Sequence, residues 1–307
     1  MILCCGEALI DMLPRQGAGG ELLFAPHCGG AVYNTAVALG RLGAPAGFLS
    51  GISTDFFGEM LLDGLAAAQV DHARVIRSDR PTTLAFVRLV DGQAAYAFND
   101  ENTAGRMLDA TDMPEPGPDV QAMFFGGISL AVEPCGGAYE ALMLREAHRR
   151  PVMLDPNIRP GFIRDEAAYR ARMERMIAAA TVVKLSDEDL HWLEGPGDEG
   201  DLAQAILRRG PSIVLVTSGG QGAGAFFPAG ETWRPARKVT VADTVGAGDT
   251  FNAGFLASLH EDGALSLEAL HDPGHDLIRK ALELGMAAAA VTVSRAGANP
   301  PWRSELA

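Results

Sequence analysis

The chain has 307 residues, 48% of them hydrophobic, so it can bury the core of one large α/β domain or two small ones. Its formal net charge of −14 argues against a polyanionic partner such as nucleic acid, because binding a polyanion needs a basic face. A phosphate ligand stays possible, since backbone amides and a few cations can dominate the local field.

The cysteines and the N-terminus bear on the cellular compartment. Cys4, Cys5, Cys28 and Cys135 show no metal-ligand spacing, and the adjacent pair makes a poor disulfide framework, so reduced thiols are expected. The chain starts without the basic segment of a signal peptide, and no apolar run approaches the ~20 residues of a membrane helix. These features predict a cytoplasmic protein with no membrane partner.

Hydrophobic patterns predict strands and helices along the whole chain. Short apolar runs indicate strands, and longer runs with helical spacing indicate helices. The predicted strands are residues 2–5, 46–52, 82–90, 93–99, 123–126, 152–155, 181–185 and 213–217, with the end of another at 239–242. The predicted helices are 31–42, 55–69, 134–149, 167–179 and one that begins near 251. Strands and helices alternate from residue 122, which predicts a parallel sheet with helices on both faces.

Two polar motifs follow the first predicted strand. Glu7 and Asp11 lie just past its carboxyl end, where open α/β sheets bind ligands, although both can equally be solvated loop charges. Gly29 and Gly30 then open a helix with Asn34 about one turn inside it. Asn34 can point at a ligand held by the glycines, or it can be a polar helix residue facing solvent.

The two strands around Asp91-Gly92 form a predicted hairpin. Segments near the N-terminus can pair with it, which would produce a small sheet that stands off the α/β body. This sheet, from roughly 9–26 and 82–100, is a candidate lid over a ligand site or a surface hairpin without function. Phe98 lies on it and suits stacking on a sugar.

Polar residues also follow two later strands. Arg159 ends the run Asp155-Pro-Asn-Ile-Arg and can offer two parallel donors to a phosphate, or it can be a surface arginine after a turn. Ser186 and Asp189, just after Lys184, have the spacing of an ordinary helix capping box.

The strongest signal in the chain is the segment 243–250. Gly246 and Gly248 let the backbone turn sharply and bring its N–H groups close to a ligand at the start of a helix, where the helix dipole favours an anion. Asp249 lies in that first turn. A tight turn capped by Asp249 is the alternative, but it does not explain the second carboxylate, Asp243. The segment is not a Walker loop, because the Gly-Lys-Ser/Thr ending is missing.

These motifs resemble the ribokinase/PfkB family of sugar kinases across essentially the whole chain. Gly-Gly-x-x-x-Asn-x-Ala at 29–36 is similar to the N-terminal signature of the family, and Asp-Thr-x-Gly-Ala-Gly-Asp at 243–249 is similar to its C-terminal signature. The resemblance implies a single kinase domain over 1–307. Its fold would be a doubly wound, mostly parallel sheet flanked by helices, with the small β-sheet as a lid.

The resemblance also implies a role for individual residues. Asp249 would be the catalytic base, already ionised at neutral pH and needing no raised pKa. An anion hole would be formed by the backbone of Gly246, Ala247 and Gly248. The implied sugar-binding residues are Asp11, Gly29, Gly30, Asn34 and Phe98. The implied nucleotide-binding residues are Arg159, Lys184, Ser186, Thr217, Gly219 and Gly222. ATP and Mg²⁺ are the implied cofactors, and a potassium ion would be held by Asp243, Val245, Arg295 and Gly297.

Within the family, the motifs are most similar to those of bacterial fructokinases, which implies conversion of D-fructose to fructose 6-phosphate. The alternatives are a kinase for 2-keto-3-deoxygluconate, ribose or a nucleoside, and a catalytically silent regulator that binds sugar or nucleotide. Related ketodeoxygluconate kinases tend to have an arginine soon after the second lid strand. Here Asn99 and Asp100 stand there and Arg106 comes later, which favours a neutral sugar.

The same resemblance bears on oligomeric state through the lid. Ala85, Val87, Tyr96 and Phe98 are expected to share an apolar face of this sheet. If the body does not cover that face, a lid-to-lid homodimer would cover it.

Overall fold

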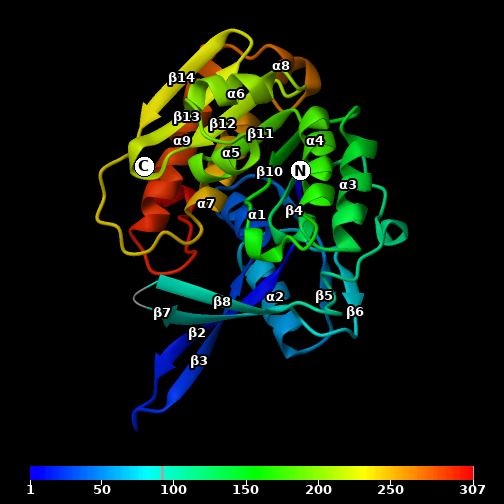
Figure 1. The fold of residues 1–307 in the computed structure, drawn as a ribbon, viewed down its shortest axis with the longest axis vertical. Coiled ribbons are helices and arrows are strands. Elements are labelled where there is room, and N and C mark those ends of the chain that lie inside the picture. Colours follow the sequence, from blue (N-terminus) through cyan, green and yellow to red (C-terminus); the bar gives the residue numbers. More distant parts are fainter. Residues whose placement is uncertain (91–92, 307) are drawn as a thin grey trace.

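The computed structural model describes residues 1–90 and 93–306, and for 88–90 and 93–96 it describes the backbone only. Eight strands form the main sheet, in the order β14-β13-β12-β11-β10-β9-β1-β4 (Figure 1). Neighbouring strands run parallel from β12 to β4, and β13 and β14 form an antiparallel edge. The strands are β1 Ile2–Cys5, β4 Ala46–Leu49, β9 Ala122–Gly126, β10 Val152–Asp155, β11 Val182–Ser186, β12 Ile213–Thr217, β13 Gly222–Phe227 and β14 Gly230–Pro235.

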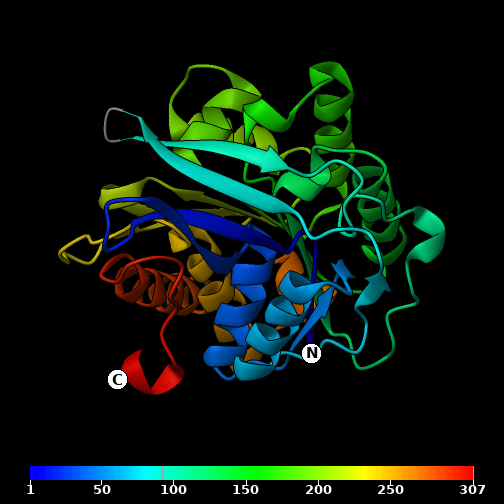
Figure 2. The same cartoon turned by 90° about the horizontal axis from the view of Figure 1, so that it is seen from below.

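Helices cover both faces of this sheet, and Figure 2 shows the two helical layers on opposite sides of it. One layer contains α1 Ala31–Arg41, α2 Phe56–Ala67, α7 Ala247–Glu261, α8 Leu267–His271 and α9 His275–Val293. The other contains α3 Cys135–Glu146, α4 Glu166–Ala179, α5 Asp187–Glu194 and α6 Glu199–Leu207. Side chains of β1 alternate between the layers: Ile2 and Cys4 pack in the first core, and Leu3 and Cys5 in the second. The chain therefore has the doubly wound fold that its sequence predicts.

The small sheet has four strands in the order β3-β2-β7-β8. They are β2 Leu9–Gln16, β3 Leu22–Gly29, β7 Leu84–Val90 and β8 Gln93–Asn99. The parallel pairing of β2 with β7 sets Asp11 opposite Ala85. Ala85 and Val87 are buried, and Ala85 packs with Leu9 and Ile128, so the body covers this part of the predicted apolar face. The predicted turn at Asp91-Gly92 and the side chain of Tyr96 lie outside what the structure describes.

Two predicted strands differ from the structure. The run 46–52 is divided into β4, which pairs with β1, and β5 (Gly51–Ser53), which pairs with β6 (Ile76–Ser78) in a separate two-stranded sheet. The predicted strand end at 239–242 is wrong, because this segment has no neighbouring strand and Val239 and Val241 are exposed. Instead, the N–H of Ala242 donates to the carbonyl of Val293 at the end of α9.

The predicted helices form with slightly different ends. Asp55 caps α2 by accepting from the N–H of Gly58, and α1 begins directly after Gly30. All four cysteines are free thiols. Among the described residues, no helix has the length and apolar character that spanning a membrane requires.

Candidate active site

The N-terminus of α7 carries the glycine motif. Gly246 precedes the helix with φ 79°, a left-handed conformation that favours glycine. Gly248 has ordinary helical geometry, so the prediction that both glycines allow the turn is wrong for Gly248. A Cβ on Gly248 would lie 3.1 Å from Nζ of Lys184, a tight contact that would push the ammonium away by a few tenths of an ångström. The N–H of Ala247 donates to the carbonyl of Thr244 at 3.3 Å, and the next two N–H groups, of Gly248 and Asp249, have no partner within the helix, so this helix start can bind an anion.

Asp249 lies in the first turn of α7 and is 7% exposed. Its Oδ2 accepts a hydrogen bond of 2.9 Å from Nδ2 of Asn34 on α1. The pKa of Asp249 is raised to about 7, and burial is the main cause. The charges of Asp155 and Glu7 add to this rise, whereas the Asn34 hydrogen bond and the Lys184 charge oppose it. The expectation that Asp249 has an unraised pKa is therefore wrong, because its site is more buried than a helix start suggests.

Lys184 and Asp155 form a buried ion pair next to Asp249. They lie on neighbouring strands, β11 and β10, and their Nζ and Oδ2 atoms are 3.1 Å apart. The same Oδ2 accepts a hydrogen bond of 2.7 Å from Nδ2 of Asn252 on α7. Strands β10 and β11 and the start of α7 thus bring Asp155, Lys184 and Asn252, which are distant in the sequence, into contact with one another.

Four of the five predicted sugar-binding residues meet at the start of α1, and the fifth, Phe98, lies at the end of β8 against Phe162. A Cβ on Gly29 would lie 2.2 Å from Oδ2 of Asp11, so only glycine leaves room for that carboxylate. Gly30 has φ 106°, which again favours glycine. Burial raises the pKa of Asp11 to about 6. Asp11, the diglycine and Asn34 therefore come together, as the sequence predicts.

Glu7 is more important than its sequence position indicates. It is buried, and its carboxylate accepts hydrogen bonds from the N–H of Ala31 at 3.0 Å and from Oγ of Ser129 at 2.9 Å. It therefore ties the first turn of α1 to the turn after β9. A glutamate directly after a buried strand was the available signal, but its two partners are far away in the sequence.

Ser186 and Asp189 form the capping box that their spacing predicts, at the start of α5. Asp189 also accepts a hydrogen bond of 2.9 Å from the N–H of Ile158, so both of its oxygens are bound to backbone N–H groups. Thr217 ends β12, and Gly219 and Gly222 follow in a turn with φ values of 47° and 130°.

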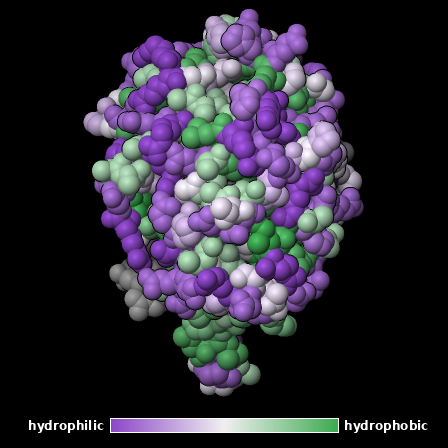
Figure 3. Space-filling view, turned by 90° about the vertical axis from the view of Figure 1, so that its right-hand side faces the viewer, coloured by the Kyte–Doolittle hydropathy of each residue, from purple (hydrophilic) through white to green (hydrophobic). Residues whose placement is uncertain are grey.

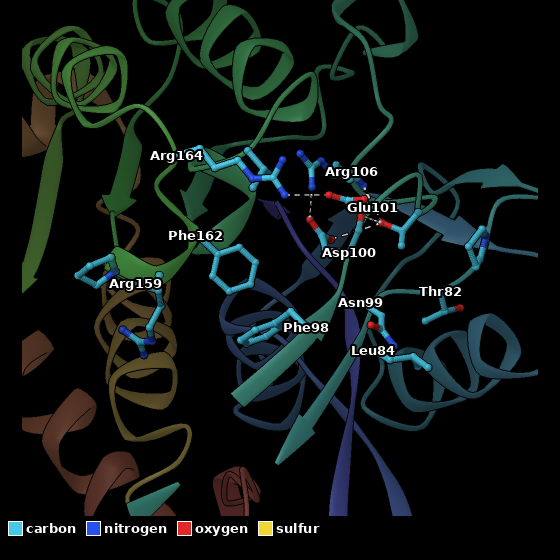
Figure 4. A pocket seen from close by; sticks show the side chains of 15 residues that line it. Thr82, Leu84, Phe98, Asn99, Asp100, Glu101, Arg106, Arg159, Phe162 and Arg164 are labelled. Carbon is cyan, nitrogen blue, oxygen red and sulfur yellow. Dashed lines mark hydrogen bonds and ion pairs between the residues drawn. The ribbon is translucent and has the colours of Figure 1, made fainter. Parts of the chain in front are cut away.

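A cavity of about 950 Å³ lies between the end of β8 and the segment after β10 (Figure 4). The rings of Phe98 and Phe162 meet there with centroids 4.3 Å apart. The carboxylates of this cavity are paired: Asp100 lies 3.5 Å from Arg106, and Glu101 lies 2.8 Å from Arg164 (Figure 4). Arg159 lines the same cavity, and in the described part of the chain its Nη1 donates only to its neighbour's carbonyl, that of Ile158.

Asp243 joins two loops next to α7. Its Oδ2 accepts a hydrogen bond of 2.9 Å from the N–H of Gly297, and its Oδ1 accepts one of 3.1 Å from the N–H of Val245. Gly297 has φ 69°, and the side chain of Arg295 pairs with Glu305. The four residues of the predicted potassium site therefore lie on two loops that Asp243 holds together.

Comparison with known proteins decides the family. The model of the pfkB family carbohydrate kinases matches residues 1–305. The chain belongs to this family. It is 54% identical to a fructokinase of Rhizobium leguminosarum bv. trifolii over 266 residues, which cover 87% of this chain and 82% of that enzyme.

Solved structures of family members have the same fold. A fructokinase of Xylella fastidiosa with bound ATP is 28% identical, with a TM-score of 0.90 over 99% of this chain and 96% of that one. A doubly substituted fructokinase of Vibrio cholerae O395, solved with fructose, ADP and a potassium ion, is 26% identical. It has a TM-score of 0.84 over 97% of this chain and 93% of that one. This chain is therefore a carbohydrate kinase by family and by fold.

Proposed function

We propose that this carbohydrate kinase transfers the γ-phosphoryl group of ATP to the 6-hydroxyl of D-fructose. The observation that carries the proposal is Asp249, a buried carboxylate at the open N-terminus of α7 that the Asn34 side chain contacts from the sugar side. The similarity to fructokinases supports fructose as the substrate. In this arrangement fructose lies between the small sheet and Asp11, Gly29, Gly30 and Asn34.

Asp249 accepts the proton of the 6-hydroxyl as that oxygen attacks the γ-phosphorus. A carboxyl with a pKa of about 7 suits a general base, because a base works best when its pKa is near the working pH. The N–H groups of Gly246, Ala247 and Gly248 stabilise the charge on the transferring group, and one such donor is typically worth ~2.7–4 kcal/mol. Closure of the small sheet over the sugar would exclude water and limit wasteful hydrolysis of ATP.

The metal requirements follow from the available ligands. Among the described residues, no cluster of three or more acidic, histidine or cysteine side chains fits a metal ion. We therefore infer that Mg²⁺ arrives with the nucleotide phosphates, its usual partners in kinases, and neutralises their charge. The carboxylate of Asp243 and carbonyl oxygens of its two loops suit a potassium ion, since hard cations prefer oxygen ligands.

The paired cavity residues favour a neutral sugar over a sugar acid. Arg106 is not free to bind a substrate carboxylate, because Asp100 holds it and also accepts a hydrogen bond of 3.0 Å from Oγ1 of Thr83. Arg159 has no carboxylate partner among the described residues, and we assign it to the phosphates of ATP and not to the sugar. The alternative function, a catalytically silent regulator that binds sugar or nucleotide, is disfavoured. Asp249 and the glycine motif are intact, and a protein that only binds its ligand does not need a catalytic base.

We interpret the chain as a single catalytic domain with a lid. We further propose that the protein acts in the cytoplasm as a homodimer. The hairpin of β2 and β3 carries Leu22, Leu23 and Phe24, which are exposed. It projects from the lower end of the molecule, with a hydrophobic surface directly above its more hydrophilic tip (Figure 3). A second copy could cover this hairpin. Light scattering tests this: a monomeric mass at micromolar concentration would contradict the dimer.

The test of the function is ADP release from Mg-ATP with fructose, 2-keto-3-deoxygluconate, ribose, glucose and adenosine, with and without potassium. We expect saturable turnover with fructose and an increase with potassium. Turnover confined to another compound would overturn the substrate assignment, and silence with all five would favour the regulator.

A further inference from the structure

Lys184, Asp155 and Asn252 form a buried polar group that the proposed mechanism does not use. Lys184 is 2% exposed, Asp155 is 1% exposed and Asn252 is fully buried. Oδ2 of Asp155 accepts two hydrogen bonds, one of 3.1 Å from the ammonium of Lys184 and one of 2.7 Å from the side-chain amide of Asn252. Because Asn252 lies in α7, this contact ties the start of that helix to β10 and β11.

The ammonium of Lys184 lies against the anion-binding end of α7. A Cβ on Gly248 would be 3.1 Å from Nζ, so the charge approaches the backbone whose N–H groups bind the transferring phosphoryl. Burial alone would lower the pKa of Lys184, but the carboxylates of Asp155, Asp189 and Asp249 raise it above its usual value. Lys184 therefore stays protonated at neutral pH.

A buried ion pair is a poor way to stabilise a fold, because desolvating two charges can cost more than their attraction returns. An apolar pair of similar volume would fill the same space. This pair lies directly behind the anion hole. In a site that excludes water, a fixed charge such as the ammonium of Lys184 acts strongly over a few ångströms, so it can stabilise a bound anion.

We propose that Lys184 is a positioning residue for phosphoryl transfer: with Asp155 and Asn252 it holds α7 and supplies a fixed positive charge behind the anion hole. The inference rests on the proposed kinase function. It attributes the effect on the rate to the charge of Lys184 and not to its packing, and it predicts that a side chain on Gly248 would displace that charge.

Variants of the pair separate charge from packing. The groups that act on the Asp249 carboxyl are Asn34 from α1, Glu7 after β1, Asp155 from β10 and Lys184 from β11. Lys184→Met removes the cation and should raise the pKa of Asp249. Asp155→Asn removes an anion and should lower that pKa. The double variant removes both charges, so their opposite effects on Asp249 cancel and its pKa should return towards that of the wild type.

We would measure kcat, KM for ATP and fructose, and the pH dependence of kcat/KM for all three variants. Removing one oxyanion donor lowers kcat by ~10²–10³, and we expect a loss of roughly tenfold or more for Lys184→Met, with KM for ATP little changed. The double variant should keep the low kcat although its pH profile is nearly normal. Lys280→Met, which removes an exposed lysine paired with Asp262, is the matched control and should behave as wild type.

A second readout does not depend on turnover. Calorimetry would compare the affinity for MgADP with and without aluminium fluoride, a mimic of the transferring group, and an NMR titration of labelled aspartate would report the Asp249 pKa directly. Lys184→Met should lose affinity mainly for the fluoride complex. If wild-type enzyme phosphorylates no sugar but the pKa moves as expected, the proposed function fails and the electrostatic inference stands. Unchanged kcat, unchanged fluoride-complex affinity and an unmoved pKa in a folded Lys184→Met protein would overturn the inference.

Discussion

Asn34 and Asp249 are 215 positions apart in the chain, yet Nδ2 of the first donates to Oδ2 of the second at 2.9 Å. The contact joins α1 and α7, and Oγ1 of Thr35 adds a bond of 3.3 Å to the carbonyl of Asp249. Both helices begin at the site, so their N-terminal dipoles converge on it. Asn34, which is expected to bind the sugar, thus also influences the ionisation of Asp249, the expected catalytic base.

Asn34→Ala should shift the pH dependence of the enzyme. The acid limb of kcat/KM reports the free-enzyme base and is expected near pH 7, with activity lost as pH falls and Asp249 is protonated. Removing the Asn34 hydrogen bond withdraws a contact that favours the ionised form, so the limb should move to higher pH. An acid limb that stays at the wild-type pH in this variant would show that Asn34 does not tune Asp249.

Asp249→Asn should nearly abolish turnover and should stabilise the folded protein above neutral pH. The folded pKa of about 7 exceeds the usual aspartate value of 3.8, so ionising Asp249 costs stability as pH rises from 4 to 7. At ~1.4 kcal/mol per pKa unit, the cost above pH 7 is about 4 kcal/mol.

Thermal melts of wild type, Asp249→Asn and the exposed-site control Glu231→Gln would test this between pH 4 and 8. The advantage of Asp249→Asn should be largest at pH 8 and shrink towards pH 4. A constant difference across the range would mean that the Asp249 pKa is not raised, and robust turnover would remove Asp249 from the role of base.

Gly248→Ala should lower kcat without weakening the fold. Alanine favours a helix, but its Cβ would lie 3.1 Å from Nζ of Lys184 and would displace the ammonium by a few tenths of an ångström. Kinetics and melting temperatures should be compared with Gly274→Ala, where an added Cβ meets nothing within 4 Å. Equal kcat values for the two variants would refute the steric explanation.

Asp100→Asn should increase activity towards a sugar acid. It weakens the hold on Arg106, whose Nη1 is 3.5 Å from Oδ2 of Asp100 in the cavity of Figure 4. We expect kcat/KM for 2-keto-3-deoxygluconate to rise severalfold and that for fructose to change little. Adding Arg106→Met should remove the gain; a gain that survives this second change would point to another cation.

Local patterns in the sequence predicted much of this protein. The parallel strands appear as short apolar runs because both faces of the sheet are covered. The diglycine and the segment 243–249 are motifs that can be recognised from consecutive residues, although the structure adds contacts to distant ones such as Lys184 and Gly297. Family membership and the gathering of Asp11, Asn34 and the anion hole follow from such local signals, since the carboxyl ends of parallel strands meet at one edge.

Other features were decided only when distant segments packed together. The split of 46–52 depends on which strand each half pairs with, and Val239 and Val241 show a strand-like pattern without a neighbour to complete it. Glu7 looked like a loop charge until its partners near residues 31 and 129 were in place. No single segment contains these partners.

The same holds for the electrostatics of the site. The sequence by itself determined that Asp249 begins a helix after a glycine turn, beside a site for an anion. The tertiary structure decided that its carboxyl is buried and has a pKa of about 7, and that Lys184 stands behind Gly248. The pKa of a group depends on how much all of its neighbours in space bury it and on the charges that they carry. Most of those neighbours are far away along the chain.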